Sequence, residues 1–241
     1  MIIKNVFILA TLTLALSAPS HAMEEVDPLS VGVSPLAIDH LDKAMTALVE
    51  TGRRSGVVWA VAKDGKLITH KAAGLRDMEA NLPMQKDSLF RYYSMSRAVN
   101  AAAVMINYEE GKFKLDDPVS KYIPAFANTP VLKDRKGDPT KTEPQSTPLT
   151  VKHLLTYTSG LGYPFDYDPA LEMGFENILW PGLTIEQGVD YLATKPLLFQ
   201  PGKHWYYGFS GDVLGRLVEI WSGQPYNEFL QDRIFDPLGL E

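Results

Sequence analysis

Residues 91–105 read RYYSMSRAVNAAAVM, and the rest of the chain is organised around this stretch. An aromatic run stops at Ser94. Small or apolar residues then recur at helical spacing: Val99, Ala102, Ala103 and Ile106. The pattern predicts a helix that opens at Ser94, where free backbone N–H groups favour negative charge. This position suits a serine whose oxygen becomes an attacking anion. It also suits an ordinary helix N-cap, which is the favoured interpretation when the stretch is taken alone.

Position 97 shares the helical face of Ser94, because residues three apart on a helix are neighbours. The residue there is Arg97, and no serine in the chain has a lysine three residues further on. A lysine could accept a proton from the serine, whereas a guanidinium is not deprotonated in proteins. Arg97 is therefore either part of an unusual site or an ordinary solvated or ion-paired helix residue.

Composition bounds the classes of function. The chain has 241 residues, of which 45% are hydrophobic and 22% charged, as in ordinary globular proteins of one sizeable core or two packed lobes. Its net charge of −6 and the lack of a basic stripe argue against a nucleic-acid partner. There is no cysteine, and the five histidines show no metal-binding spacing, so we expect no metal and no other cofactor.

Residues 1–22 have the pattern of a signal peptide. Lys4 provides the positive charge, residues 6–16 form an apolar run, and Ser20 and Ala22 are small residues before a cleavage site at Met23. We expect export to the periplasm or the medium. The apolar run is short for a membrane span, so no stable membrane anchor is expected after cleavage, and an uncleaved anchor is the alternative.

After a lead-in segment at 23–35, the pattern of the N-terminal part is α+β. Helical spacing over 36–51 predicts an amphipathic helix, and two apolar runs at 57–62 and 67–73 flank Asp64-Gly65, which predicts a β-hairpin. The first run does not alternate, which favours a strand buried on both faces. Residues 74–88 are expected to be a polar connector.

The remainder is predicted to be mostly helical. Thr150 and Thr184 are expected N-caps, Gly223 is an expected helix end, and Tyr226 opens a last helix. The proline-rich residues 128–150 should be a surface excursion. The aromatic residues between 163 and 181 should either line a cleft or pack beneath a loop.

Two further stretches raise the significance of Ser94: LTVKHLLTYTSGL at 149–161 and PGKHWYYGFSGDVLGRLVE at 201–219. Together with Ser94 and IFDPLG at 234–239, they resemble the class C β-lactamase-like serine hydrolases. That family includes class C β-lactamases, D-alanyl-D-alanine carboxypeptidases and esterases of the β-lactamase fold. The four stretches occur in the family's order and spacing, over essentially all of the chain after residue 22.

The resemblance implies a β-lactamase/transpeptidase-like fold, with a helical lobe beside an antiparallel sheet, and acyl transfer through a serine ester. It implies that Ser94 is the nucleophile, that Arg97 stands where the family has the lysine of S-x-x-K, and that Tyr207 faces the serine. The β-lactamase branch has Tyr-Ser-Asn where this chain has Tyr207-Gly208-Phe209, and the sequence DVLG at 212–215 is closer to the esterase branch. Carboxylic esters are therefore the expected substrates, with β-lactams and small amides or peptides as alternatives.

Two departures from the family pattern affect the expected activity. Arg97 cannot share the base function of a lysine, but its charge can stabilise a tyrosinate at Tyr207, so we expect impaired catalysis. Because of Arg97, a non-catalytic member that binds peptidoglycan or a peptide is the competing interpretation, and an unrelated α+β binding module is a third. Taken alone, Tyr207 could also be a buried tyrosine that caps a 208–222 helix. Family members also continue beyond the IFDPLG stretch, so we expect 36–241 to be a domain that lacks its C-terminal part, with an incomplete sheet.

Overall fold

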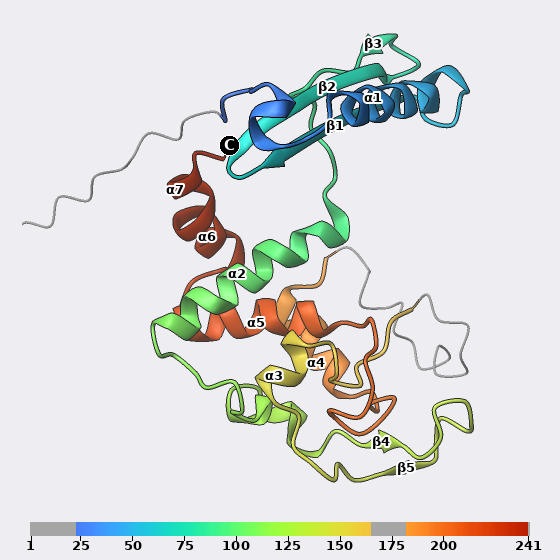
Figure 1. Cartoon of the computed structure of the whole chain (residues 1–241). Helices are drawn as coiled ribbons and strands as arrows, with labels where there is room; N and C mark the ends of the chain where they lie inside the picture. Colours follow the sequence, from blue (N-terminus) through green and yellow to red (C-terminus); the bar gives the residue numbers. More distant parts are fainter. Residues whose placement is uncertain (1–22, 165–181, 241) are drawn as a thin grey trace, which may run out of the picture. The chain divides into compact units, whose positions relative to one another are not determined.

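The computed structural model describes residues 23–164 and 182–240. The chain divides into two compact units between Arg91 and Tyr92 (Figure 1). Residues 1–22, the expected signal peptide, and most of the aromatic stretch between 163 and 181 lie outside the described residues.

The first unit is one helix on a small antiparallel sheet. After the 3-10 turn η1 (Pro28–Val31), its elements are α1 (Pro35–Glu50), β1 (Gly56–Lys63), β2 (Lys66–Asp77) and β3 (Leu82–Pro83), with the strands in the order β1-β2-β3. Figure 1 shows α1 running along the β1–β2 hairpin. Asp64 and Gly65 both have positive φ angles, of 52° and 72°, as a two-residue hairpin turn requires. The predicted helix and hairpin are confirmed.

Two predictions for this unit are wrong. The segment after Gly74 is not simply a connector, because β2 continues to Asp77 and pairs with β3. Gly74 lies opposite Gly56 and has a φ of +82°, so a position that looks like a strand end from sequence is a bend within the strand. Strand β1 is also not buried on both faces: only Trp59 in it is buried. The indole N–H of Trp59 donates to Asp42 of α1 at 2.8 Å, which marks the covered face.

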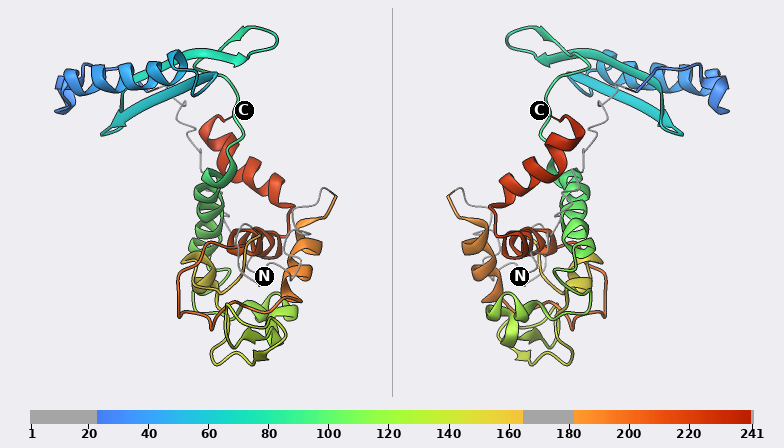
Figure 2. Two further views of the ribbon diagram at one scale, coloured as in Figure 1. Left: turned by 90° about the vertical axis from the view of Figure 1, so that its right-hand side faces the viewer. Right: turned by 90° about the vertical axis from the view of Figure 1, so that its left-hand side faces the viewer.

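The second unit is a helical cluster. Its elements in chain order are η2 (Tyr93–Met95), α2 (Ser96–Glu109), η3 (Val119–Lys121), η4 (Pro124–Asn128), β4 (Val131–Leu132), β5 (Thr142–Glu143), α3 (Val151–Leu155), α4 (Ile185–Ala193), α5 (Ser210–Ser222), α6 (Tyr226–Leu230), the π-helical turn η7 (Gln231–Phe235) and α7 (Asp236–Leu238). Figure 2 shows this unit from two opposite sides. No helix within the described ranges is long and apolar enough to cross a membrane.

Helix α5 is the centre of this unit. It packs against α2, α3, α4 and α6, and the predicted apolar face is fully inside: Val213, Leu214, Leu217, Val218 and Trp221 are all buried. The helix ends at Gly223, whose φ of +73° is the left-handed conformation that glycine adopts most easily. The predicted end of α5 is therefore confirmed, and the helix begins at Ser210 instead of at the predicted residue 208.

Both predicted threonine caps are present. The hydroxyl of Thr150 accepts from the backbone of His153 at 3.4 Å, and that of Thr184 accepts from Gln187 at 3.1 Å. His153 Nδ1 in turn accepts from the backbone of Thr150 at 3.2 Å, which completes a capping box. Burial lowers the pKa of His153, which fits this acceptor role.

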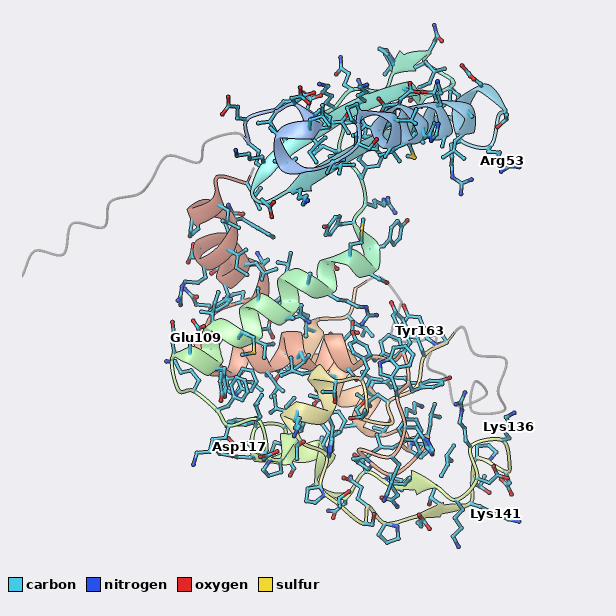
Figure 3. All side chains as sticks on the ribbon, viewed as in Figure 1. Arg53, Glu109, Asp117, Lys136, Lys141 and Tyr163 are labelled. Atoms are coloured by element: carbon cyan, nitrogen blue, oxygen red, sulfur yellow. The ribbon has the colours of Figure 1, made fainter. Side chains whose placement is uncertain are left out.

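The excursion at 128–150 is more ordered than its composition indicates. It contains the short β4–β5 hairpin, and Val131 and Leu132 of β4 are buried. Figure 3 shows Lys136 and Lys141 on the connection between these two strands. The prolines and charges of the segment hide this hairpin because only two residues on each side pair.

Asp117, labelled in Figure 3, holds together the segment after α2. Its carboxylate accepts from Tyr122 (2.6 Å), from the backbone of Lys114 (3.0 Å) and from Lys121 (2.9 Å), and these bonds lower its pKa from 3.8 to about 2. Because the folded-state pKa is the lower one, the carboxylate stabilises the fold above pH ~4, and this contribution is lost as the pH falls towards 2.

We expect Asp117→Asn to lower the free energy of unfolding at pH 7 by about 1–2 kcal/mol, and by much less at pH 2–3. Thermal unfolding followed by circular dichroism between pH 2 and 7 tests this. Asp116→Asn, which removes the neighbouring exposed carboxylate, is the matched control. A deficit of Asp117→Asn that stays constant across this pH range would refute the linkage.

Candidate active site

Ser94 lies in η2, two residues before the start of α2. The helix begins at Ser96, whereas the sequence pattern predicted a start at Ser94. Its hydroxyl does not cap the helix, because the N-cap of α2 is Met95 and neither turn has a side-chain cap. Instead, Ser94 Oγ lies 2.5 Å from the hydroxyl of Tyr207. The N-cap interpretation of this serine is therefore wrong, and its hydroxyl is available for chemistry.

The preceding backbone is unusual. Tyr93 has a φ of +46°, which is rare for a bulky side chain and costs about 1–3 kcal/mol. The hydroxyl of Ser96 donates to the carbonyl of Tyr93 at 2.5 Å and supports this conformation. Strain of this kind is found where the surrounding structure fixes a functional group in place.

Tyr207 reaches Ser94 because two distant stretches run side by side. The backbone N–H of Tyr206 donates to Tyr157 O at 2.8 Å, and that of Phe209 donates to Gly162 O at 3.2 Å. Between these bonds the chains are so close that a Cβ atom on Gly208 would lie 2.0 Å from the carbonyl oxygen of Leu161. Gly208 is thus required by packing, at the position where the β-lactamase branch of the family has serine.

Arg97 is the third member of the cluster. Its Nε–H donates to the Tyr207 hydroxyl at 3.0 Å, and its Nη1 donates to the Tyr157 hydroxyl. The guanidinium carbon lies 4.3 Å from the centroid of the Tyr207 ring and 5.2 Å from that of Tyr157. Within the described part of the chain, no carboxylate forms an ion pair with Arg97. Arg97 is therefore not an ordinary surface residue of α2.

The charges around Ser94 follow from these contacts. Burial lowers the pKa of Arg97, but its interactions with Tyr157 and Tyr207 outweigh burial and raise it, so Arg97 stays cationic. Burial raises the pKa of Tyr157, and the nearby charge of Arg97 acts in the opposite direction without reversing the shift. Tyr157 is therefore a neutral phenol at neutral pH.

A cavity of about 490 Å³ opens beside these residues. Its apolar and aromatic wall includes Tyr163, Leu183, Ile185, Phe209 and Tyr226. Tyr163 is labelled in Figure 3. The polar lining includes Asn100, whose Nδ2 donates to Gly211 O at 2.7 Å, and Asp212. Asp212 is exposed on the cavity wall. Desolvation by the surrounding protein nevertheless raises the pKa of its carboxyl, and the positive charge of Arg97 acts in the opposite direction.

The structure thus brings together Ser94, Arg97 and Tyr207, the three residues named from sequence. Tyr207 does not cap α5, since the N-cap of that helix is Phe209. Three polar residues of the site had no assigned role: Asn100, Tyr157 and Asp212. Asn100 had a detectable signal, because it lies one turn beyond Arg97 on the same helical face.

The family model described as Beta-lactamase matches residues 41–241 of the chain. The chain belongs to the beta-lactamase family. Esterase EstB of Burkholderia gladioli is 34% identical over 228 residues, which cover 89% of this chain and 53% of EstB. Lovastatin esterase of Penicillium rubens is 34% identical over 204 residues, covering 83% and 51% of the two chains.

Among solved structures, EstCE1, a hydrolase with promiscuous acyltransferase activity, is similar with a TM-score of 0.72 and 31% identity, over 85% of this chain and 52% of EstCE1. The expected family and the β-lactamase/transpeptidase-like α+β fold are thereby confirmed. This beta-lactamase family chain spans about half the length of the curated relatives that it matches.

Proposed function

We propose that the protein is an exported serine hydrolase that cleaves carboxylic esters through an acyl-enzyme on Ser94. The observation that carries the proposal is the 2.5 Å contact between Ser94 Oγ and the Tyr207 hydroxyl, which itself accepts a hydrogen bond from Arg97. A serine needs a neighbouring base to become a nucleophile, and this phenolic oxygen is placed to be one.

In the proposed reaction, the Tyr207 oxygen is the general base, and the permanent charge of Arg97 stabilises negative charge on that oxygen between the proton transfers. The proton of Ser94 moves to the Tyr207 oxygen as Ser94 Oγ bonds to the ester carbonyl carbon. The bond to the leaving alkoxide then breaks, and Tyr207 gives that alkoxide the proton. In the second half, water transfers a proton to Tyr207 and attacks the acyl carbon, and the same proton returns to Ser94 as the acid leaves. Backbone N–H groups of the turn around Ser94 can stabilise the oxyanion.

The choice of esters rests on the walls of the cavity and on the relatives. Tyr163, Leu183, Ile185 and Tyr226 give the cavity an apolar and aromatic wall, and Phe209, which is buried, stands where the β-lactamase branch of the family has an asparagine. This wall suits an apolar acyl group better than an amide that requires hydrogen-bonding partners. Two relatives of 34% identity are esterases by name, which supports the same substrate class.

A second candidate is a protein that binds peptidoglycan or another peptide in the same cavity without turnover. The observation that favours it is that Arg97 stays cationic and therefore cannot accept a proton from Ser94. Within the described residues, Tyr207 is then the one candidate base that hydrogen-bonds with Ser94. Both candidates include export, which is supported by the pattern of residues 1–22.

Labelling with a fluorophosphonate separates the two candidates. We expect one covalent adduct, mapped to Ser94 by mass spectrometry on the protein in its natural length, and no adduct in Ser94→Ala. Tyr207→Phe should slow labelling by about 10²–10⁴-fold, the range for positioned acid–base catalysis. The labelled, exported protein should begin at Met23.

An adduct on Ser96, two residues away, or none at all under conditions that label a known esterase, would contradict the serine-hydrolase proposal. Labelled protein that retains Met1 in a membrane fraction would contradict export alone.

A further inference from the structure

The backbone of Tyr157 is in a conformation that its side chain disfavours. Tyr157 follows α3 and its C-cap Thr156, and has a φ of +56°. Glycine is the usual residue at such a helix end, because a Cβ atom is strained in the left-handed region. The segment is fixed there by hydrogen bonds from Thr158 N to His153 O (2.9 Å) and from Tyr206 N to Tyr157 O (2.8 Å). A tyrosine at a position where glycine would relieve backbone strain indicates that the side chain has a specific role.

That side chain accepts from a different nitrogen of the Arg97 guanidinium than Tyr207 does. Nη1 donates to the Tyr157 hydroxyl, whereas Nε donates to Tyr207. The two phenol rings are stacked, with centroids 5.9 Å apart and an angle of 24° between their planes. A planar guanidinium held by one hydrogen bond can still rotate about it, while two bonds from different edges fix its orientation.

A competing partner for Arg97 lies in the same cavity. The carboxyl of Asp212 lines it, and the charge of Arg97 already favours the ionised form of that carboxyl. Within the described residues, the Asp212 carboxylate takes part in no ion pair. Without the bond to Tyr157, the guanidinium could turn towards Asp212 and withdraw Nε from Tyr207.

We propose that Tyr157 is a positioning residue, which holds one end of the Arg97 guanidinium so that the other end stays on Tyr207. The inference rests on the proposed function of Ser94 and Tyr207. It also specifies why an arginine can work here: the planar cation needs two fixed acceptors, whereas a lysine ammonium is a compact charge that needs no such orientation.

The test is a double-mutant cycle between Tyr157→Phe and Arg97→Lys, with kcat/KM for a p-nitrophenyl ester measured from pH 5 to 10. Phenylalanine keeps the ring contacts of Tyr157 with Tyr207 and Trp205 and removes only the hydroxyl. In the Arg97 parent, we expect Tyr157→Phe to lower kcat/KM about 10–100-fold at pH 7, with the acid limb of the profile moved to higher pH. In the Arg97→Lys background, the same substitution should change kcat/KM less than about threefold.

Equal losses in both backgrounds, or a uniform loss that leaves the pH profile unmoved, would show that Tyr157 only packs. A second readout does not depend on turnover: hydrogen exchange of the Arg97 Nε–H, assigned by its disappearance in Arg97→Lys. We expect this exchange to be at least about tenfold faster in Tyr157→Phe, because the guanidinium is then free to leave Tyr207. Unchanged exchange would overturn the positioning role. An absence of hydrolysis in every variant, with faster exchange in Tyr157→Phe, would count against the proposed function alone.

Discussion

Ester hydrolysis is expected to disappear when Ser94 is replaced by alanine and to increase when Arg97 is replaced by lysine. The first change removes the side-chain oxygen that hydrogen-bonds with the Tyr207 hydroxyl. The second replaces a permanent cation by an amine that can accept a proton. Because positioned acid–base catalysis contributes about 10²–10⁴-fold, that range bounds the gain from Arg97→Lys.

The measurement is p-nitrophenyl ester turnover by the parent and the two variants at matched concentration, with each protein in its natural length. Arg233→Lys is the matched control. Arg233 is partly exposed, pairs with Glu110 at 2.7 Å, lies 5.6 Å from the Phe229 ring centroid and is not part of the cavity lining, so the same chemical change there should leave turnover unaltered. Full activity in Ser94→Ala would eliminate the catalytic interpretation. If Arg97→Lys has no effect while Ser94→Ala is inactive, Tyr207 is a sufficient base and the expected impairment by Arg97 is wrong.

The second large effect is expected from Gly208→Ala. The added methyl would lie 2.0 Å from the carbonyl oxygen of Leu161, so the two stretches that carry Tyr157 and Tyr207 must separate. Overpacking of this kind typically costs about 1–3 kcal/mol. Displacement of Tyr207 by about 1 Å should also lower kcat about 10²-fold.

Gly215→Ala is the matched control for stability, since its methyl would meet Tyr226 at an ordinary distance of 3.8 Å. Within α5 this substitution should be neutral or stabilising by up to about 1 kcal/mol. Chemical denaturation and ester turnover of both variants test the prediction. A Gly208→Ala protein as stable and as active as the parent would show that Leu161 and Gly208 separate without cost.

Local patterns were sufficient for much of the fold. The helix at α1, the β1–β2 hairpin and the caps at Thr150 and Thr184 each depend on residues close together in sequence, and each was predicted correctly. The order of the motif stretches was sufficient to bring Ser94 and Tyr207 into one site, although 113 positions separate them.

What the sequence did not reveal depends on contacts between distant backbones. Gly74 looks like a strand end, but pairing with Gly56 makes it a bend within β2. The need for glycine at 208 comes from the carbonyl of Leu161, which no local pattern places nearby. The role of Tyr157 is hidden for the same reason. Its positive φ angle is a conformation that usually selects glycine, and its hydroxyl accepts from Arg97, which is 60 positions away in the sequence.

Tyr93 and Tyr157 are both bulky residues with a positive φ angle, and they lie beside Ser94 and Arg97. At such positions glycine relieves backbone strain, so a library selected for thermostability alone would drift towards glycine at 93 and 157. On the proposed function, the same drift removes the Tyr157 hydroxyl from Arg97 and the support immediately before the nucleophile. Directed evolution of a more robust catalyst should therefore hold both tyrosines fixed and look for stability elsewhere in the chain.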